Sequence, residues 1–159
     1  MFSKSVLNIV KSDGSKVPYE NGKGWKLAAA TYYVDVSLPD APRSIIHMSW
    51  DAALAATITY QGSNLPAYQS ESQPYTDNSA AADVALTDST AGNWITENPS
   101  TAYVPVVTGV TVTNMTLTVA GSNAGGSRFD VTNAYRRARI AVVASTGGFF
   151  RCHAHGKGE

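Results

Sequence analysis

Two histidines near the C-terminus have a spacing that could bind a metal ion. His153 and His155 are separated by one residue, so on an extended chain their imidazoles point to the same side. Gly147 precedes them and Glu159 follows them in the pattern Gly-x5-His-x-His-x3-Glu. Imidazole and carboxylate ligands together suit the open coordination sites of divalent transition metals. These residues are therefore the candidate metal ligands of the chain.

The surroundings of this motif argue against a metal ion. Arg151 lies two residues before His153, and a neighbouring positive charge disfavours a bound cation. The motif resembles the first metal-binding motif of the cupin family, in which a second histidine-bearing motif follows. No such motif follows here, and the only other histidine is His47. We therefore predict no metal site and no cofactor.

The remaining nucleophiles have no catalytic setting. Cys152 is the only cysteine, and its alternation places it with Phe150 and Ala154 on the core side of its strand. A buried structural thiol is the expected role of a free cysteine there. The sequence also lacks the Gly-x-Ser-x-Gly motif of serine hydrolases. We expect no catalytic residues, and the chain is not predicted to be an enzyme.

The elements that carry these residues alternate apolar and polar side chains, which is typical of half-buried β-strands. Three such strands have the apolar faces Tyr32-Val34-Val36-Leu38, Ile46-Met48-Trp50 and Leu54-Ala56-Ile58-Tyr60. The run 110–119 changes parity near Asn114, which predicts a bulge or a tight turn. The best helical candidate is the short segment 80–86. The pattern predicts an all-β antiparallel sandwich of roughly seven or eight strands, with long loops and little or no helix.

Residues 135–155 are predicted to form an antiparallel hairpin that turns near Gly147. Matching the parity of its arms requires a loop of about three or five residues, and both lengths are common in hairpins that contain glycine. The core-facing residues of the arms are Ala138, Ile140, Val142, Ala144, Phe150, Cys152 and Ala154. The opposite side is basic, and we expect it to be an interaction surface made of Arg136, Arg137, Arg139, Arg151, His153 and His155.

Composition indicates one domain that associates with other proteins. A chain of 159 residues supports one hydrophobic core, with residues 1–30 as an N-terminal arm or extended segment and residues 31–159 as a single β-sandwich domain. Charged residues make up only 15% of the chain, and the formal net charge is zero. A neutral surface with few charges favours association.

Charge is nevertheless unevenly distributed along the chain. Residues 61–101 contain five acidic residues and no lysine or arginine, whereas residues 128–159 contain six basic and two acidic residues. In an assembly, the acidic stretch of one copy could contact the basic residues of its neighbour; pairing within one chain is the alternative. The zero net charge and the absence of a second basic stripe argue against nucleic acid as a partner.

Aromatic residues suggest an alternative function. Tyr68, Tyr75 and Trp94 lie in or beside the acidic, loop-rich stretch, and exposed aromatic rings on a β-sandwich can stack on sugar rings. Burial of Trp94 at the start of a short strand is the structural alternative, because large aromatic residues are usually buried. A carbohydrate-binding module for host-surface glycans is the second function considered.

The C-terminal part of the chain resembles small virion proteins of tailed bacteriophages. The resemblance runs roughly from residue 90 to the C-terminus and depends on the weakly charged Ala/Ser/Thr-rich makeup, on the segment Gly92-Asn93-Trp94-Ile95, and on the runs 135–142 and 147–157. It implies a jelly-roll or related β-sandwich that serves as a capsid cement or decoration protein without enzymatic activity. A tail, neck or fibre component of the same virion is the alternative placement.

The same resemblance implies the partners and the location. The expected partners are the major capsid protein or other virion subunits and further copies of the chain, with a homotrimer favoured and with neither nucleic acid nor membrane involved. The first ten residues are too short and too polar for a signal peptide, and no segment reads as a transmembrane span. We therefore expect a virion protein that is assembled in the host cytoplasm.

Overall fold

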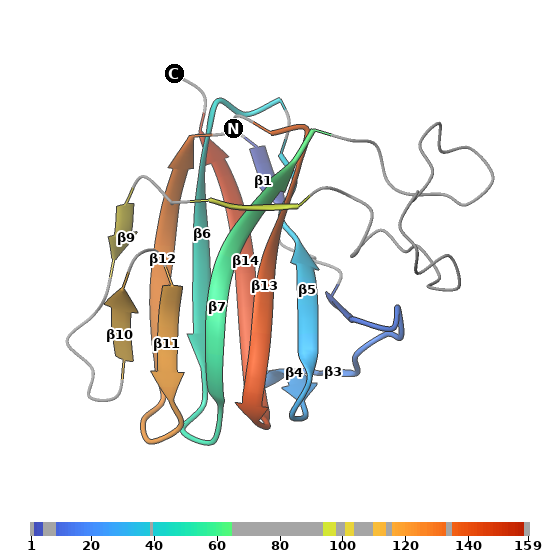
Figure 1. The fold of residues 1–159 in the computed structure, drawn as a ribbon, viewed down its shortest axis with the longest axis vertical. Coiled ribbons are helices and arrows are strands. Elements are labelled where there is room, and N and C mark those ends of the chain that lie inside the picture. Colours follow the sequence, from blue (N-terminus) through green and yellow to red (C-terminus); the bar gives the residue numbers. More distant parts are fainter. Residues whose placement is uncertain are drawn as a thin grey trace, which may run out of the picture.

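The chain folds into two antiparallel β-sheets that pack face to face (Figure 1). The computed structural model describes residues 2–4, 9–38, 40–64, 94–97, 101–103, 110–113, 116–132 and 135–157. Every regular element in these ranges is a β-strand, so the predicted all-β sandwich is confirmed. Within the same ranges, no helix has the length and apolar character needed to cross a membrane.

Each sheet contains seven strands among the described residues. Sheet A has the order β3 (Tyr19–Glu20), β4 (Gly24–Leu27), β14 (Gly148–Lys157), β6 (Arg43–Trp50), β12 (Gly125–Thr132) and β9 (Thr101–Tyr103), and β1 (Phe2–Lys4) pairs with β14. Sheet B has the order β10 (Val110–Thr113), β11 (Thr116–Ala120), β7 (Ala55–Ser63), β13 (Arg137–Thr146), β5 (Thr31–Asp35) and β2 (Ile9–Lys11), and β8 (Ile95–Glu97) pairs with β7.

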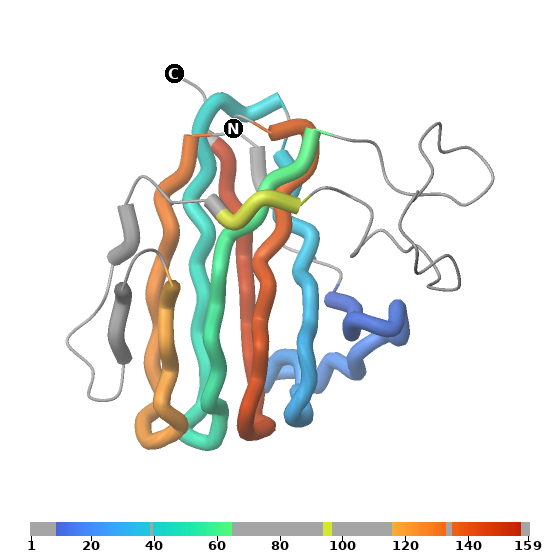
Figure 2. The backbone as a smooth tube through the Cα atoms, viewed as in Figure 1, coloured from blue at the N-terminus to red at the C-terminus, as the bar shows by residue number. Residues whose placement is uncertain are grey.

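The eight central strands form a jelly roll. Four of them have the order β4-β14-β6-β12 in sheet A, and the other four have the order β5-β13-β7-β11 in sheet B. The chain therefore passes from one sheet to the other at most connections, and four of these crossings lie at the lower end of the sandwich (Figure 2). Jelly rolls occur in viral capsid proteins, in lectins and in cupins, so the architecture alone does not decide the function.

The core lies between the two sheets, and the alternating pattern identified its residues correctly. The predicted strands at 32–38, 45–50 and 54–60 correspond to β5, β6 and β7, and their apolar faces are buried except for the partly buried Leu38. The fully buried side chains of largest volume include Tyr60, Phe129, Phe150, Ile46, Leu54, Ile58, Leu117 and Ile140. Period-two burial on both sheets is what a two-layer sandwich requires.

The predicted C-terminal hairpin is wrong. β13 pairs with β5 and β7 in sheet B, whereas β14 pairs with β4, β6 and β1 in sheet A. The single residue between them, Gly147, carries the chain from one sheet to the other. A Cβ atom on Gly147 would lie 2.5 Å from the carbonyl oxygen of Leu27, and one on Gly148 would lie 2.6 Å from the backbone nitrogen of Leu54. Two glycines are therefore needed because backbones approach closely at this crossing.

Two other expectations concern the ends and edges of the sheets. The segment 1–30, predicted as an arm or extended segment, supplies β1 to β4 to both sheets, and Ile9, Trp25 and Leu27 lie in the core. Of the bulge or tight turn predicted near Asn114, the strand pairing supports the turn, because β10 and β11 pair antiparallel with Thr113 opposite Thr116. The helical candidate 80–86 lies outside the described residues.

Candidate functional site

The predicted basic surface is divided between the two outer faces of the sandwich. Arg137 and Arg139 of β13 lie on sheet B, whereas Arg151, His153 and His155 of β14 lie on sheet A. The expectation that they share one face is wrong, because it depended on β13 and β14 being neighbours in one sheet. The division of inward and outward residues along each strand is correct: Cys152 and Ala154 are buried, for example.

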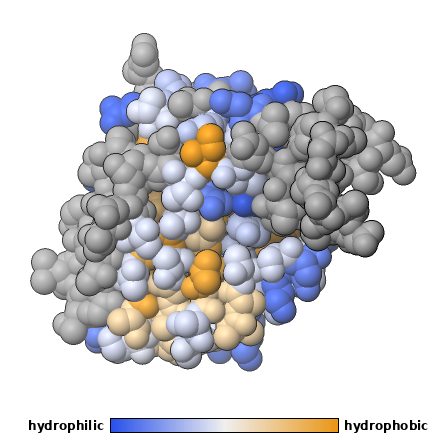
Figure 3. Space-filling view, viewed as in Figure 1, coloured by the Kyte–Doolittle hydropathy of each residue, from blue (hydrophilic) through white to orange (hydrophobic). Residues whose placement is uncertain are grey.

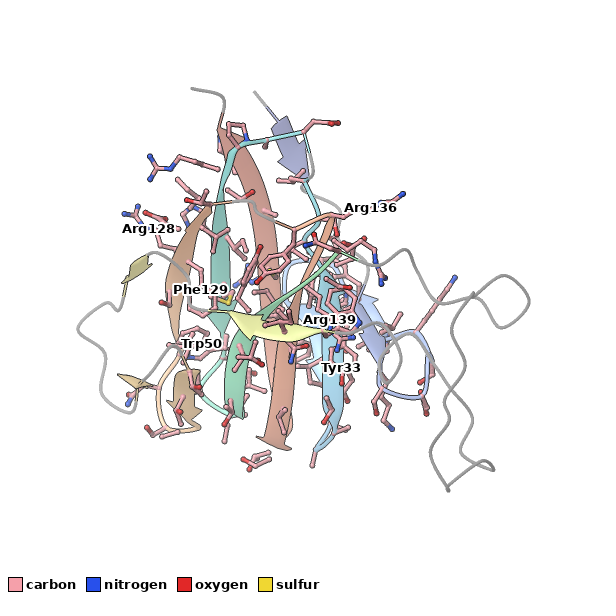
Figure 4. All side chains as sticks on the ribbon, turned by 45° about the horizontal axis from the view of Figure 1, so that its top comes forward. Tyr33, Trp50, Arg128, Phe129, Arg136 and Arg139 are labelled. Carbon is pink, nitrogen blue, oxygen red and sulfur yellow. The ribbon has the colours of Figure 1, made fainter. Side chains whose placement is uncertain are left out.

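Arg139 is buried on the outer face of sheet B. Its side chain is covered by two aromatic rings, with Cζ 3.8 Å from the ring centroid of Tyr33 and 4.0 Å from that of Trp94. Figure 4 shows Arg139 beside Tyr33. Its Nε donates a hydrogen bond of 2.8 Å to Oε1 of Gln61. Cation–π contacts and hydrogen bonds to a charged group are both strengthened where water is excluded. Arg139 thus joins β5, β7 and the residue before β8.

Trp94 is held in this cluster by a second arginine. Cζ of Arg137 lies 4.7 Å from the Trp94 ring centroid. Beside it, Nε2 of Gln61 donates a hydrogen bond of 3.4 Å to Oγ1 of Thr96 on β8. We call Tyr33, Gln61, Trp94, Arg137 and Arg139 the arginine stack. The cluster fixes β8 to the outer face of sheet B.

The arginine stack bears on the carbohydrate-binding alternative. Trp94, the central residue of the predicted sugar platform, is partly buried and already contacts two guanidinium groups. Tyr68 and Tyr75, its expected companions, lie outside the described residues. The following residue, Ile95, is 47% exposed, so the aromatic ring is the better covered of the two, as expected for burial at the start of a short strand. No described observation favours a sugar site.

Below the arginine stack, sheet B has an uncharged outer face. Two rows of neighbouring residues cross its strands: Thr31, Val143, Thr57 and Thr118, and then Tyr33, Ala141 and Thr59. Ala141 is buried and Tyr33 belongs to the arginine stack, so we call the remaining residues, Thr31, Thr57, Thr59, Thr118 and Val143, the neutral face. Val143 is 49% exposed at its centre. In Figure 3 this part of the surface is pale to orange, and the blue, hydrophilic atoms lie at the rim and in one central spot. The neutral face contains no lysine, arginine, aspartate or glutamate.

Sheet A has an outer face of the opposite character. Arg128 of β12, His47 of β6 and His153 of β14 lie side by side, because His47 pairs with both of the others. In the next row, His155 lies opposite Ile45, which pairs with Asp130. Arg128 extends away from the sandwich, whereas the adjacent Phe129 points into it (Figure 4). We call the outer face of sheet A the basic face.

The histidines of the basic face are close to one another and to an ion pair. The ring centroids of His47 and His153 are 6.3 Å apart, and those of His153 and His155 are 6.4 Å apart. Nε of Arg128 lies 3.5 Å from Oδ1 of Asp130. Partial burial lowers the pKa of His47, and the positive charges of His153 and Arg128 act in the same direction. The neutral form of His47 is therefore favoured in the isolated chain.

The two described metal candidates, His153 and His155, are not part of a metal-binding cluster. Among the described residues, no group of three or more His, Cys, Asp or Glu side chains is placed to hold a metal ion. His153 and His155 point outward from sheet A, and Glu159 lies outside the described residues. Cys152 points into the core, where burial raises the pKa of its thiol to about 12. The predicted buried thiol is confirmed.

Some residues of these faces were missed from the sequence. His47, Arg128 and Asp130 join the C-terminal histidines because β6 lies between β12 and β14. Alternation had indicated that His47 points outward, but pairing between distant strands carries no local signal. Arg136, by contrast, is exposed just before β13, and its backbone nitrogen donates a hydrogen bond of 3.0 Å to Oδ1 of Asn64.

Comparisons of the chain with protein-family models, with curated proteins and with solved structures found no match. Its function is therefore inferred from the chemistry of the two outer faces, together with the sequence.

Proposed function

We propose that this chain is a structural protein of a tailed-bacteriophage particle, of the cement or decoration type. In this role it covers or stabilises the head shell through protein–protein contacts. It forms a homo-oligomer, with a trimer favoured, and it contacts the major capsid protein or other virion subunits. A tail or neck position in the same particle would use the same two faces.

The neutral face carries this proposal. Covering charged groups costs free energy unless they are paired, so the centres of protein interfaces are depleted in charged residues. The two rows around Val143 and Thr57 present hydroxyl and methyl groups on a broad sheet surface. Threonine hydroxyls can exchange water for hydrogen bonds to a partner at little net cost. Such a surface is suited to repeated contacts in an assembly.

The arginine stack supports the same role. It covers Arg139 and fixes β8 beside the neutral face, so that the upper part of sheet B is already ordered before any partner binds. Association is stronger when little ordering is required on binding. A preformed face of this kind is typical of a subunit that docks rigidly.

Site-specific photo-crosslinking in particles tests the proposal. We would replace Val143 on the neutral face and Arg151 on the basic face, one at a time, by the photoreactive residue p-benzoylphenylalanine. Illumination of purified particles is expected to link at least one of these positions to another copy or to a shell protein. The exposed Ser122, in the turn between β11 and β12, is the matched control position and should form fewer adducts.

Two outcomes would contradict the proposal. One is the absence of adducts from both faces in particles that contain the chain. The other is particle imaging that shows the chain as an isolated monomer without a partner on either face.

A further inference from the structure

All three histidines of the chain lie on the basic face. His47 lies directly opposite His153 across β6 and β14, and His155 follows on the same side of β14. Histidine is the side chain whose charge changes between about pH 5 and pH 8. Because the chain has no other histidine, its whole imidazole titration takes place on one surface.

Fixed positive charges surround these histidines. The charged and titratable residues described on this face are Glu20, Lys23, Lys26, Arg43, His47, Arg128, Asp130, Arg151, His153 and His155. The acidic residues in this set are Asp130, which lies 3.5 Å from Nε of Arg128, and Glu20, which lies 3.7 Å from Nζ of Lys23, and the lysines and arginines outnumber them. The face is therefore basic at neutral pH and becomes more so on acidification.

We propose that the basic face binds a carboxylate-rich surface of a partner protein and takes up protons at its histidines as the complex forms. This inference rests on the proposed docking function and adds the chemistry of the partner.

The chemistry of the face favours carboxylates over other ligands. Arg43, Arg128 and Arg151 present planar guanidinium groups, which match carboxylates with paired hydrogen bonds. The same arginines disfavour a metal cation at the histidines. Nucleic acid binding depends on many phosphate contacts and on an excess of positive charge, whereas this chain has a formal net charge of zero. A local patch of acidic side chains is the better match in charge.

Proton uptake follows from the position of the histidines. In the isolated chain, partial burial and the charges of His153 and Arg128 lower the pKa of His47. Carboxylates placed against the face would favour the protonated imidazole and raise that pKa. When binding raises the pKa of a group, the complex holds more protons than its separated parts, and affinity increases as pH falls.

Binding of poly-L-aspartate tests the inference. Its carboxyl groups stay ionised at about pH 5.5, because the reference pKa of aspartate is about 3.9. Calorimetry of the full chain, with EDTA present, would compare about pH 5.5 with about pH 7.5 at about 0.1 M salt. We expect affinity at least about tenfold higher at the lower pH, with an uptake of about one to three protons per complex.

Variants separate the histidines from general charge. The triple variant H47Q/H153Q/H155Q should lose the pH dependence, so that affinities at the two pH values agree within about twofold. Arg151→Gln should weaken binding at both pH values, whereas Lys16→Gln, which removes one exposed positive charge elsewhere, should change little. If the triple variant does not fold, NMR titration of the three imidazoles in the wild-type chain gives the same answer: each should protonate at higher pH when poly-L-aspartate is bound.

Three results would overturn the inference. They are no binding of poly-L-aspartate, binding with the same affinity at both pH values, and tighter binding of a thymidine oligonucleotide of equal charge. A chain that still crosslinks in particles through Val143 but fails these tests would lose this inference and keep the proposed function.

Discussion

Replacing Arg139 by alanine is expected to destabilise the sandwich by about 3.5 kcal/mol. Arg139 is only 6% exposed, and its guanidinium contacts the rings of Tyr33 and Trp94. Each cation–π contact contributes about 1 kcal/mol when it is partly shielded from water. The hydrogen bond from Nε to Gln61 contributes about 1.5 kcal/mol, because its donor is charged. The loss should appear as a lower free energy of unfolding in urea, followed by circular dichroism.

Arg137→Ala is the matched control for this prediction. Arg137 lies on the same face and strand but is more exposed, and it has one ring contact at 4.7 Å. Its loss should cost about 0.5 kcal/mol. A double-mutant cycle between Arg139→Ala and Trp94→Leu should give a coupling free energy of about 1 kcal/mol. If Arg139→Ala unfolds within about 0.5 kcal/mol of the wild type, the stack does not fix β8 and the reasoning is refuted.

Three further predictions concern the core, the sheet crossing and the histidines. Burial raises the pKa of Cys152 to about 12, so its thiol should resist labelling by a disulfide reagent at about pH 8 until urea unfolds the chain. The free energy of unfolding should also decline above about pH 9, because the thiol ionises in the unfolded chain. Rapid labelling of the native protein would contradict this prediction. Gly147→Ala should lower the free energy of unfolding in urea by about 2–3 kcal/mol, because the new Cβ would lie 2.5 Å from the carbonyl oxygen of Leu27. An unchanged urea midpoint would argue against close backbone contact at this crossing between the sheets. Because the pKa of His47 is lowered in the folded chain, the unfolded state binds its proton more readily, and the free energy of unfolding should fall as pH drops through about 6.5. His47→Gln should flatten that fall. An identical pH profile in the variant would show that His47 is not its cause.

The inward and outward sides of the strands could be predicted from the sequence. Alternation placed Phe150 and Cys152 in the core and His153 outside, because the side-chain period of a strand is two in any sheet. Strand neighbours could not be predicted in the same way. The alternation on either side of Gly147 fits a hairpin and a crossing between sheets equally well, and they are distinguished by pairing with strands far away along the chain, β5 and β7 for β13 and β4 and β6 for β14.

The same limit applies to the candidate surfaces. The sequence indicated that Arg139 points outward, but its burial depends on Trp94, which lies far away along the chain. His47 and His153 become neighbours through pairing of β6 with β14, which no local pattern specifies. The sequence could therefore predict which residues are available for contact, and the topology decides which of them act together.

The mass of the purified protein in solution tests the central claim most directly. Light scattering coupled to size-exclusion chromatography should give about three times the chain mass of 16.8 kDa, as expected for a subunit that associates through an uncharged face. Val143→Glu, which places a charge at the centre of the neutral face, should shift the mass to that of one chain, whereas Val143→Thr should leave the trimer intact. A wild-type mass of one chain at high protein concentration, or a trimer that Val143→Glu does not affect, would contradict association through the neutral face.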